Sequence, residues 1–238
     1  MTAAPLHWHD SLDSTQDEAH RLAAAGAAHG SAVAARVQTV GRGTRGRLWE
    51  SGRGGLWLSV ICRPAMGVAT EVVGLRVGLA LAELLDPQLP APHRITLKWP
   101  NDLILGQKKV AGVLAEARWH GDQLVWMVIG VGLNVRNTFP EALAATAVRL
   151  ADVGLSATAQ DLASPVARAV ADASLGSAPL SPGEVAAFES RDWLRGRAVS
   201  QPAPGIAEGI TATGRLRVRS PAGILSEVTA PVQLTRQA

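Results

Sequence analysis

The chain has little cysteine and no long apolar run. Its only cysteine, Cys62, lies inside the apolar segment 56–62. A single cysteine excludes an internal disulfide, and one in an apolar segment is more typical of a small core residue than of a nucleophile. No apolar stretch reaches the roughly 18 residues of a membrane-spanning helix, and no signal peptide is recognisable at the N-terminus. These absences favour a reducing, cytoplasmic location and no membrane partner.

The chain also lacks the common phosphate-binding fingerprints. Segment 38–49 is rich in glycine but has neither the Walker A spacing nor the dinucleotide Gly-x-Gly-x-x-Gly pattern followed by a helix. Instead, residues 41–47 interleave three glycines with three arginines. Glycine lets a backbone approach a ligand closely, and arginine is suited to phosphate and carboxylate. The segment therefore predicts a loop that orders over an anion, with a solvated surface loop as the alternative.

Positive charge is concentrated in this region. The net charge is +3, but residues 36–53 hold five arginines and one acid. Local positive charge favours an anionic ligand. A nucleic-acid-binding protein would spread basic residues over a face with interleaved aromatics, so we expect no nucleic acid partner.

The order of predicted elements indicates an α+β fold. Helices are expected at 12–28, with a capping box from Thr15 to Glu18, and at 68–86. Strands are expected at 31–38, 55–62, 95–99, 103–105, 109–118 and 123–135. Short turns between neighbouring strands favour a mixed, largely antiparallel sheet packed with helices.

The chain changes character after residue 137. Residues 138–192 are expected to be helical, with breaks at Pro165, Pro179 and 181–183. After Trp193, short β-type runs at 198–200, 205–211, 215–219 and 228–234 are separated by Gly and Pro. We expect a catalytic domain over 1–192 and a small C-terminal β-barrel over 193–238.

Three further segments combine polar groups with turns or glycine. Asp102 follows Lys98-Trp99-Pro100-Asn101 and has lysines on both sides, so it could orient a lysine or hold Mg²⁺, or simply end a strand. Lys109 begins an apolar strand in which Gly112 predicts close approach of a ligand or backbone. Segment 130–134, Gly-Val-Gly-Leu-Asn, ends a buried strand with space for a ligand, or with an ordinary turn.

Segments 41–49, 98–103, 109–116 and 130–134, in this order, resemble the biotin–protein ligases. Segment 13–16 resembles the family's Ser-Thr-Asn segment, and 209–216 resembles its C-terminal SH3-like domain. The resemblance covers nearly the whole chain. It implies a short form, because residues before 12 leave no room for the winged-helix DNA-binding domain of some members.

The resemblance also implies a reaction. Biotin and ATP, with Mg²⁺, form biotinyl-5′-AMP, and a lysine of a biotin carboxyl carrier protein then takes the biotinyl group. Lys109, Asp102 and Arg42 are the implied catalytic residues, and no residue is implied as a metal ligand. The implied ligand-binding residues are Ser14, Thr15, Gln16 and Gln38 at the biotin head group, Arg42, Gly43 and Thr44 in the loop over biotin, Arg45 and Arg47 at phosphates, Lys109 at the carboxylate and α-phosphate, Gly112 beside the ligand, and Asn134 at adenine.

Two positions depart from the family's pattern. Thr44 stands where many members have a third arginine, which predicts faster loss of the adenylate, and Gln16 replaces the usual Asn. Trp99 and strand 109–116 are expected to line an apolar slot for biotin. A lipoate or octanoate ligase of the same fold is the nearest alternative, followed by a nucleic-acid-binding module and a non-catalytic ligand-binding protein. The protein is expected to be a monomer or a homodimer.

Overall fold

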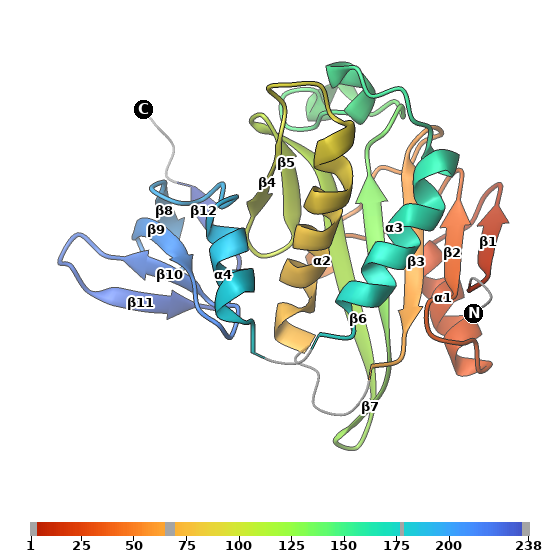
Figure 1. The fold of residues 1–238 in the computed structure, drawn as a ribbon, viewed down its shortest axis with the longest axis horizontal. Helices are drawn as coiled ribbons and strands as arrows, with labels where there is room; N and C mark the ends of the chain where they lie inside the picture. Colours follow the sequence, from red (N-terminus) through yellow and green to blue (C-terminus); the bar gives the residue numbers. More distant parts are fainter. Residues whose placement is uncertain (1–3, 65–69, 177–178, 235–238) are drawn as a thin grey trace.

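A mixed seven-stranded sheet forms the body of the protein in the computed structural model, which describes residues 4–64, 70–176 and 179–234 (Figure 1). The strands are β1 (Leu6–His9), β2 (Ala32–Ala35), β3 (Leu56–Cys62), β4 (Ile95–Lys98), β5 (Asp102–Leu105), β6 (Lys108–His120) and β7 (Gln123–Leu133). Their order is β1-β2-β3-β7-β6-β5-β4. The β1–β2 pair is parallel and the remaining pairs of this sheet are antiparallel, which confirms the predicted fold class.

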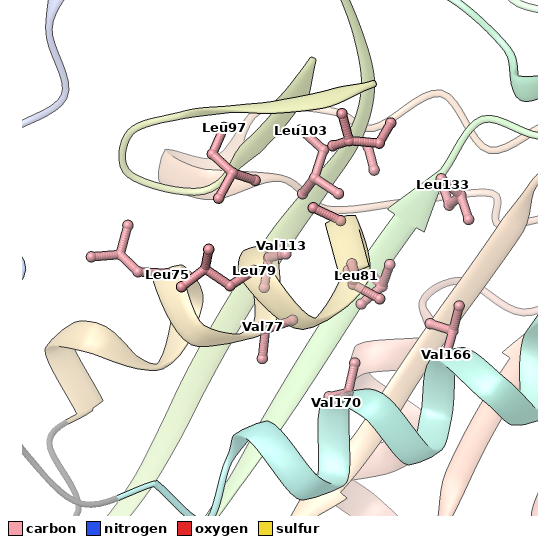
Figure 2. Packing of buried hydrophobic residues seen from close by; sticks show 14 of the residues in the cluster. Leu75, Val77, Leu79, Leu81, Leu97, Leu103, Val113, Leu133, Val166 and Val170 are labelled. Carbon is pink, nitrogen blue, oxygen red and sulfur yellow. The ribbon is translucent and has the colours of Figure 1, made fainter. Parts of the chain in front are cut away.

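Helices cover both faces of this sheet. Helices α2 (Thr70–Leu85) and α3 (Ala159–Ala173) pack on one face, where Val77 and Val170 lie over the strands that carry Val113 and Leu133 (Figure 2). Helix α1 (Thr15–Ala24) covers a smaller apolar cluster on the other face, composed of Ala19, Ala23, Val33, Ile61 and Val128. None of the helices within the described residues combines the length and hydrophobicity needed to cross a bilayer.

The two faces of the central strands differ in composition. Side chains alternate between the faces along a strand. In β3 and β7, Leu58, Val60, Ile129 and Val131 belong to the large core under α2 and α3. On the α1 face, the paired residues Ile61 and Val128 are apolar and belong to the cluster under α1. The next pair along the same face, Ser59 and Gly130, is polar and small. The apolar cluster therefore ends there, and the strand surface is left open for a site.

Two helical predictions needed correction. Helix α1 begins at Thr15 and ends at Ala24, so the predicted helix 12–28 is too long at both ends. Ser14 is its N-cap, as expected for one of the two candidate cap residues, and the Ser14 hydroxyl accepts from the Gln16 backbone amide. The predicted Thr15–Glu18 capping box is therefore wrong. Residues 138–158 contain only the 3₁₀ turns Glu141–Leu143 and Leu150–Val153. This segment hydrogen-bonds to the sheet instead, with Lys109 N donating to Thr146 O and Leu150 N donating to Asn134 O. The first two residues of the predicted helix 68–86 lie outside the described residues.

Pro165 lies inside α3 and does not break it. The following helix, α4 (Pro182–Glu189), leads to a five-stranded sheet in the order β11-β10-β9-β8-β12. Its strands are β8 (Ala198–Gln201), β9 (Gly205–Ile210), β10 (Leu216–Arg219), β11 (Leu225–Val228) and β12 (Gln233–Leu234), so the predicted single strand 228–234 is wrong. Buried residues of this sheet, such as Ile210 and Leu216, continue the large core. The division at 192/193 and the closed barrel stay predictions.

Candidate active site

A cavity of about 470 Å³ opens over the α1 face of the central strands. That volume lies within the range of small-molecule sites. The cavity brings together the predicted site residues, with one exception: Ser14, Thr15, Gln16, Gln38, Arg42, Gly43, Thr44, Arg47, Asp102, Lys109, Gly112 and Asn134 line it. The exception, Arg45, belongs to the loop formed by residues 41–49, which we call the Gly/Arg loop. Arg45 is exposed and is not among the lining residues.

Neutral hydrogen-bonding groups form a continuous relay beneath α1. The Ser59 hydroxyl lies 2.9 Å from the Thr15 hydroxyl and donates to Oε1 of Gln16 at 2.9 Å. The Gln16 amide donates in turn to the Val128 carbonyl at 3.0 Å. These side chains are almost fully buried. Because buried polar groups need partners, the relay fixes the rotamers of Thr15 and Gln16 without using a charge.

Gln38 extends the relay to the Gly/Arg loop. Its Oε1 accepts from both the backbone amide and the hydroxyl of Thr15, at 2.8 and 3.0 Å. Its Nε2 donates to Ser51 at 2.8 Å, and the Ser51 hydroxyl donates to the Trp49 carbonyl at 2.9 Å. The start of α1 and the end of the loop are therefore connected through uncharged groups alone.

Side chains lie directly over the glycines of β6 and β7. A Cβ atom at Gly132 would lie 2.5 Å from Cε2 of Trp49, and one at Gly130 would lie 2.7 Å from Oε1 of Gln16. At Gly112 it would lie 3.0 Å from the Trp49 ring and 3.1 Å from Cε of Lys109. The predicted close approach at Gly112 is thus made by Trp49 and Lys109. The Trp49 Nε1 atom is buried and has no hydrogen-bond partner among the described residues.

Lys109 is the cation at the centre of the site. Its Nζ lies 2.6 Å from Oδ1 of Asp102, on the neighbouring strand β5, and 4.7 Å from the centroid of the Trp49 ring. The carboxylate and the indole face hold the ammonium in one place. About a third of the Lys109 side chain remains exposed to the cavity, so the ammonium is accessible to an anionic ligand.

The Gly/Arg loop folds back on itself. Gly43 N donates to Arg47 O at 2.7 Å, and Trp49 N donates to Gly41 O at 2.9 Å. The turn at its tip needs left-handed backbone at Arg45, with φ of 61°, and at Gly46, with φ of 69°. Arg42, which forms an isolated β-bridge with Leu48, makes ion pairs with Asp17 and Glu116. The guanidinium of Arg47 stays close to Thr44, at 3.4 Å from its carbonyl.

A second cation, Lys98, lies in the part of the cavity that is lined by Trp193. Lys98 and Trp193 both line the cavity, and the Lys98 ammonium lies 5.3 Å from the Trp193 ring centroid. Burial lowers the pKa of Lys98, and the nearby cations Lys109, Arg47 and Arg197 act in the same direction, against Asp102. Asn134 is nine-tenths buried and accepts from Asn137 at 3.2 Å.

Sequence reasoning missed three residues of this site. Ser59 was interpreted as part of a buried strand, although it is the one polar residue of segment 56–62. Ser51 and Trp193 carried no pattern. Conversely, the prediction that Trp99 lines the apolar slot is wrong: it is buried and its indole N–H donates to Gly214 O at 2.8 Å. Strand β6 does line the cavity, through Gly112, Val113 and Leu114.

Comparisons with known proteins agree with this geometry. The protein is 38% identical over 143 residues to the bifunctional ligase/repressor BirA of Bacillus subtilis, covering 58% of this chain and 43% of that protein. It is 38% identical over 133 residues to the biotin–[acetyl-CoA-carboxylase] ligase of Mycobacterium tuberculosis, covering 54% of this chain and 47% of the relative. The matched stretch thus spans less than half of either relative.

The structural similarity extends over nearly the whole chain. The biotin protein ligase of Aquifex aeolicus, solved in complex with biotin and ATP, superposes with a TM-score of 0.82 at 26% identity, over 97% of this chain and 99% of that one. Residues 8–134, which include every predicted site residue, match the biotin/lipoate A/B protein ligase family. This chain therefore belongs to the biotin/lipoate A/B protein ligase family.

Proposed function

We propose that the protein is an ATP-dependent biotin–protein ligase. In the first step, a carboxylate oxygen of biotin bonds to the α-phosphorus of ATP, the α–β phosphoanhydride breaks, and pyrophosphate leaves. In the second step, the ε-amine of an acceptor lysine bonds to the acyl carbon of biotinyl-5′-AMP. AMP leaves, and the amine loses a proton as the amide forms. We propose a lysine of a biotin carboxyl carrier protein as the acceptor, and a cytoplasmic location.

The observation that carries this proposal is the combination of an uncharged relay and a fixed ammonium in one cavity. The relay of Thr15, Gln16, Gln38 and Ser59 presents hydroxyl and amide groups that match a neutral ureido ring. Lys109 supplies positive charge where the carboxylate and α-phosphate must meet. Charge develops on the phosphoryl oxygens in such a reaction, so a positioned ammonium in a partly enclosed site lowers the barrier.

The same relay favours biotin over lipoate or octanoate. A dithiolane ring or an alkyl chain offers no groups that pair with buried amides and hydroxyls, and a site built to hydrogen-bond its substrate discriminates strongly against an analogue that cannot. The name of the Mycobacterium tuberculosis relative, a biotin–[acetyl-CoA-carboxylase] ligase, supports the choice of biotin. The Bacillus subtilis relative, a bifunctional ligase/repressor, supports the choice of ligase chemistry.

We propose that Mg²⁺ enters as part of the substrate, MgATP. Among the described residues, no three His, Cys, Asp or Glu side chains converge in a way that could hold a metal ion. Mg²⁺ keeps several of its waters and is commonly bound through substrate phosphates, so it does not need a preformed cluster of protein ligands. Asp102, a carboxylate that lines the cavity, is paired with Lys109.

Biotin-dependent exchange between pyrophosphate and ATP tests the first step, with lipoate and octanoate as parallel substrates. Exchange with biotin alone is expected. Exchange with lipoate or octanoate alone would contradict the specificity, and no exchange with any of them would contradict the adenylation. Transfer to a purified carrier domain, measured separately with labelled biotin, tests the acceptor.

A further inference from the structure

Arg42 lies between two carboxylates that come from different elements. Its Nη2 atom is 2.8 Å from Oδ1 of Asp17, on α1, and 3.2 Å from Oε2 of Glu116, on β6. Arg42 lines the cavity, whereas Asp17 and Glu116 are not among its lining residues. The two acids therefore influence the site by holding Arg42, and they do not face the cavity themselves.

Glu116 is itself held from the side opposite Arg42. Nε2 of His20 lies 3.2 Å from Oε2 of Glu116, and the indole N–H of Trp126 donates to Nδ1 of His20 at 3.1 Å. This pattern assigns the His20 tautomer, because Nδ1 accepts and Nε2 must carry the proton that it donates to Glu116. The hydrogen bond from His20, the charge of Arg42 and a further hydrogen bond from the Gln16 side chain hold the pKa of Glu116 below its usual range, despite its partial burial. Glu116 is thus a fixed carboxylate. Because Gln16 also belongs to the uncharged relay, a comparison with an Arg42 variant is needed to separate the two contacts of Glu116.

We propose that Glu116 is a positioning residue that, together with Asp17, fixes Arg42 and so keeps the Gly/Arg loop closed over the cavity. Loop residues 43 and 44 follow directly and line the cavity. The hydrogen bonds within the loop, such as that from Gly43 N to Arg47 O, fix its internal shape but not its position over the cavity. The position of residues 43 and 44 therefore depends on where Arg42 is anchored. This role in substrate retention depends on the proposed ligase function, whereas closure of the loop does not.

Limited proteolysis with trypsin tests the anchor in the absence of any substrate. Arg45 and Arg47 are exposed at the tip of the loop, so cleavage after them reports opening. Glu116→Gln and Asp17→Asn should each speed cleavage by about three- to fivefold, the range expected for the loss of a half-exposed ion pair. Glu208→Gln is the control, because it removes an ion pair with Arg219 on the distant C-terminal sheet. Cleavage of both variants at the wild-type rate would overturn the proposal.

The steady-state kinetics of biotin adenylation test the consequence. In Glu116→Gln the KM for biotin should rise about three- to fivefold while kcat changes by less than about twofold, because the reacting groups are untouched. In an Arg42→Met background, Glu116→Gln should have no further effect on KM or on cleavage at Arg45 and Arg47. An equal effect in both backgrounds would show that Glu116 acts without Arg42 and would overturn the inference.

The two experiments separate the inference from the proposed function. If biotin supports no exchange but the variants are cleaved faster, the ligase function fails and the anchor stands. If exchange is normal and cleavage is unchanged, the ligase function stands and the anchor fails. Should Glu116→Gln disturb β6, Asp17→Asn still decides the question, because Asp17 is exposed on the surface of α1.

Discussion

The ammonium of Lys109 is held between the carboxylate of Asp102 and the indole face of Trp49, 2.6 Å from Oδ1 and 4.7 Å from the ring centroid. Asp102 belongs to the rigid sheet, whereas Trp49 ends the Gly/Arg loop. The contact with Asp102 fixes the ammonium relative to the strands, and the contact with Trp49 ties it to the position of the loop. The Lys109–Trp49 contact therefore couples closure of the loop to placement of the cation.

Replacing Lys109 should remove adenylation without unfolding the protein. Lys109→Ala deletes the ammonium that faces the cavity, and loss of one preorganised charge-stabilising group typically costs about 10²- to 10³-fold in rate. Single-turnover formation of biotinyl-5′-AMP measures the loss directly. Lys108→Ala is the matched control, since its Nζ instead donates to the Ala144 carbonyl. A near-wild-type rate in Lys109→Ala would rule out the assigned role.

Removing the Ser59 hydroxyl should weaken biotin binding. Ser59→Ala leaves Oε1 of Gln16 without its donor, and an unpaired buried polar group costs about 1–3 kcal/mol. We expect biotin affinity, measured by titration calorimetry, to fall by about tenfold. Ser31→Ala provides the control, because that hydroxyl is equally buried and forms no hydrogen bond to any described residue. Unchanged affinity in Ser59→Ala would mean that the relay does not organise the biotin site.

A methyl group at Gly132 should displace the Trp49 side chain. The added Cβ would lie 2.5 Å from the indole, so Gly132→Ala is expected to destabilise the protein by about 1–3 kcal/mol in denaturant unfolding. Combining it with Trp49→Ala should abolish this cost, because the clashing group is gone. Gly74→Ala, on α2 with its nearest contact at 3.8 Å, is the control. A cost that persists in the double variant would locate the strain elsewhere.

An arginine at position 44 should slow loss of the adenylate. Thr44 lines the cavity and its hydroxyl is 3.5 Å from Nη2 of Arg47. Thr44→Arg adds a bidentate cation near bound phosphate, and such charge-assisted pairs contribute about 1.5–3 kcal/mol. Release of preformed biotinyl-5′-AMP should therefore slow by at least about tenfold in a filter or stopped-flow assay. Thr44→Gln tests side-chain length without charge, and an equal effect of both would exclude an electrostatic cause.

The sequence predicted the sheet and most of the site because both depend on local chemistry. Strand β3 is an apolar run in the sequence, and the Gly/Arg loop is a turn-rich cationic segment. Asp102 and Lys109 lie at the beginnings of the neighbouring strands β5 and β6. Residues 138–158 were misinterpreted because Ala-rich composition predicts helix, while the native backbone groups of this segment bond to β6 and β7. Tertiary hydrogen bonding outweighed local propensity there.

At Pro165, the sequence predicted a helix break that the structure does not have. The proline ring removes a helical hydrogen bond, yet α3 continues because Leu162, Ala163 and Val166 bury one face against the core while Pro165 lies on the exposed face. The relay through Ser59 could not be found from spacing either, because Thr15 and Ser59 are separated by 44 residues in the chain. Only the register of β3 against β7 brings Ser59 opposite Gly130, where Gln16 enters.

Asp192 should make the protein more stable in mild acid than at neutral pH. Its backbone forms a β-bridge with Leu97 of β4, and one carboxylate oxygen accepts from Leu194 N at 2.8 Å. The other carboxylate oxygen is buried and has no hydrogen-bond partner in the part of the chain that the structure describes. Burial raises the pKa of Asp192 from 3.8 to about 6. The folded state thus binds the proton more tightly than the unfolded state, so this contribution to stability is present below pH 3.8 and is lost as the pH rises through about 6.

Asp192→Asn removes this ionisation and keeps the oxygen that accepts from Leu194. Near pH 4 the variant and the wild type should therefore melt together. At pH 7 to 8 the variant should be more stable by on the order of 2 kcal/mol, a Tm increase of about 5 °C for a chain of this size. Scanning calorimetry between pH 4 and 8 measures the difference, and Asp122→Asn, in the exposed β6–β7 turn, is the control. A variant that is less stable than the wild type at pH 7 would mean that the ionised carboxylate has a stabilising partner, because only then does neutralising it cost free energy.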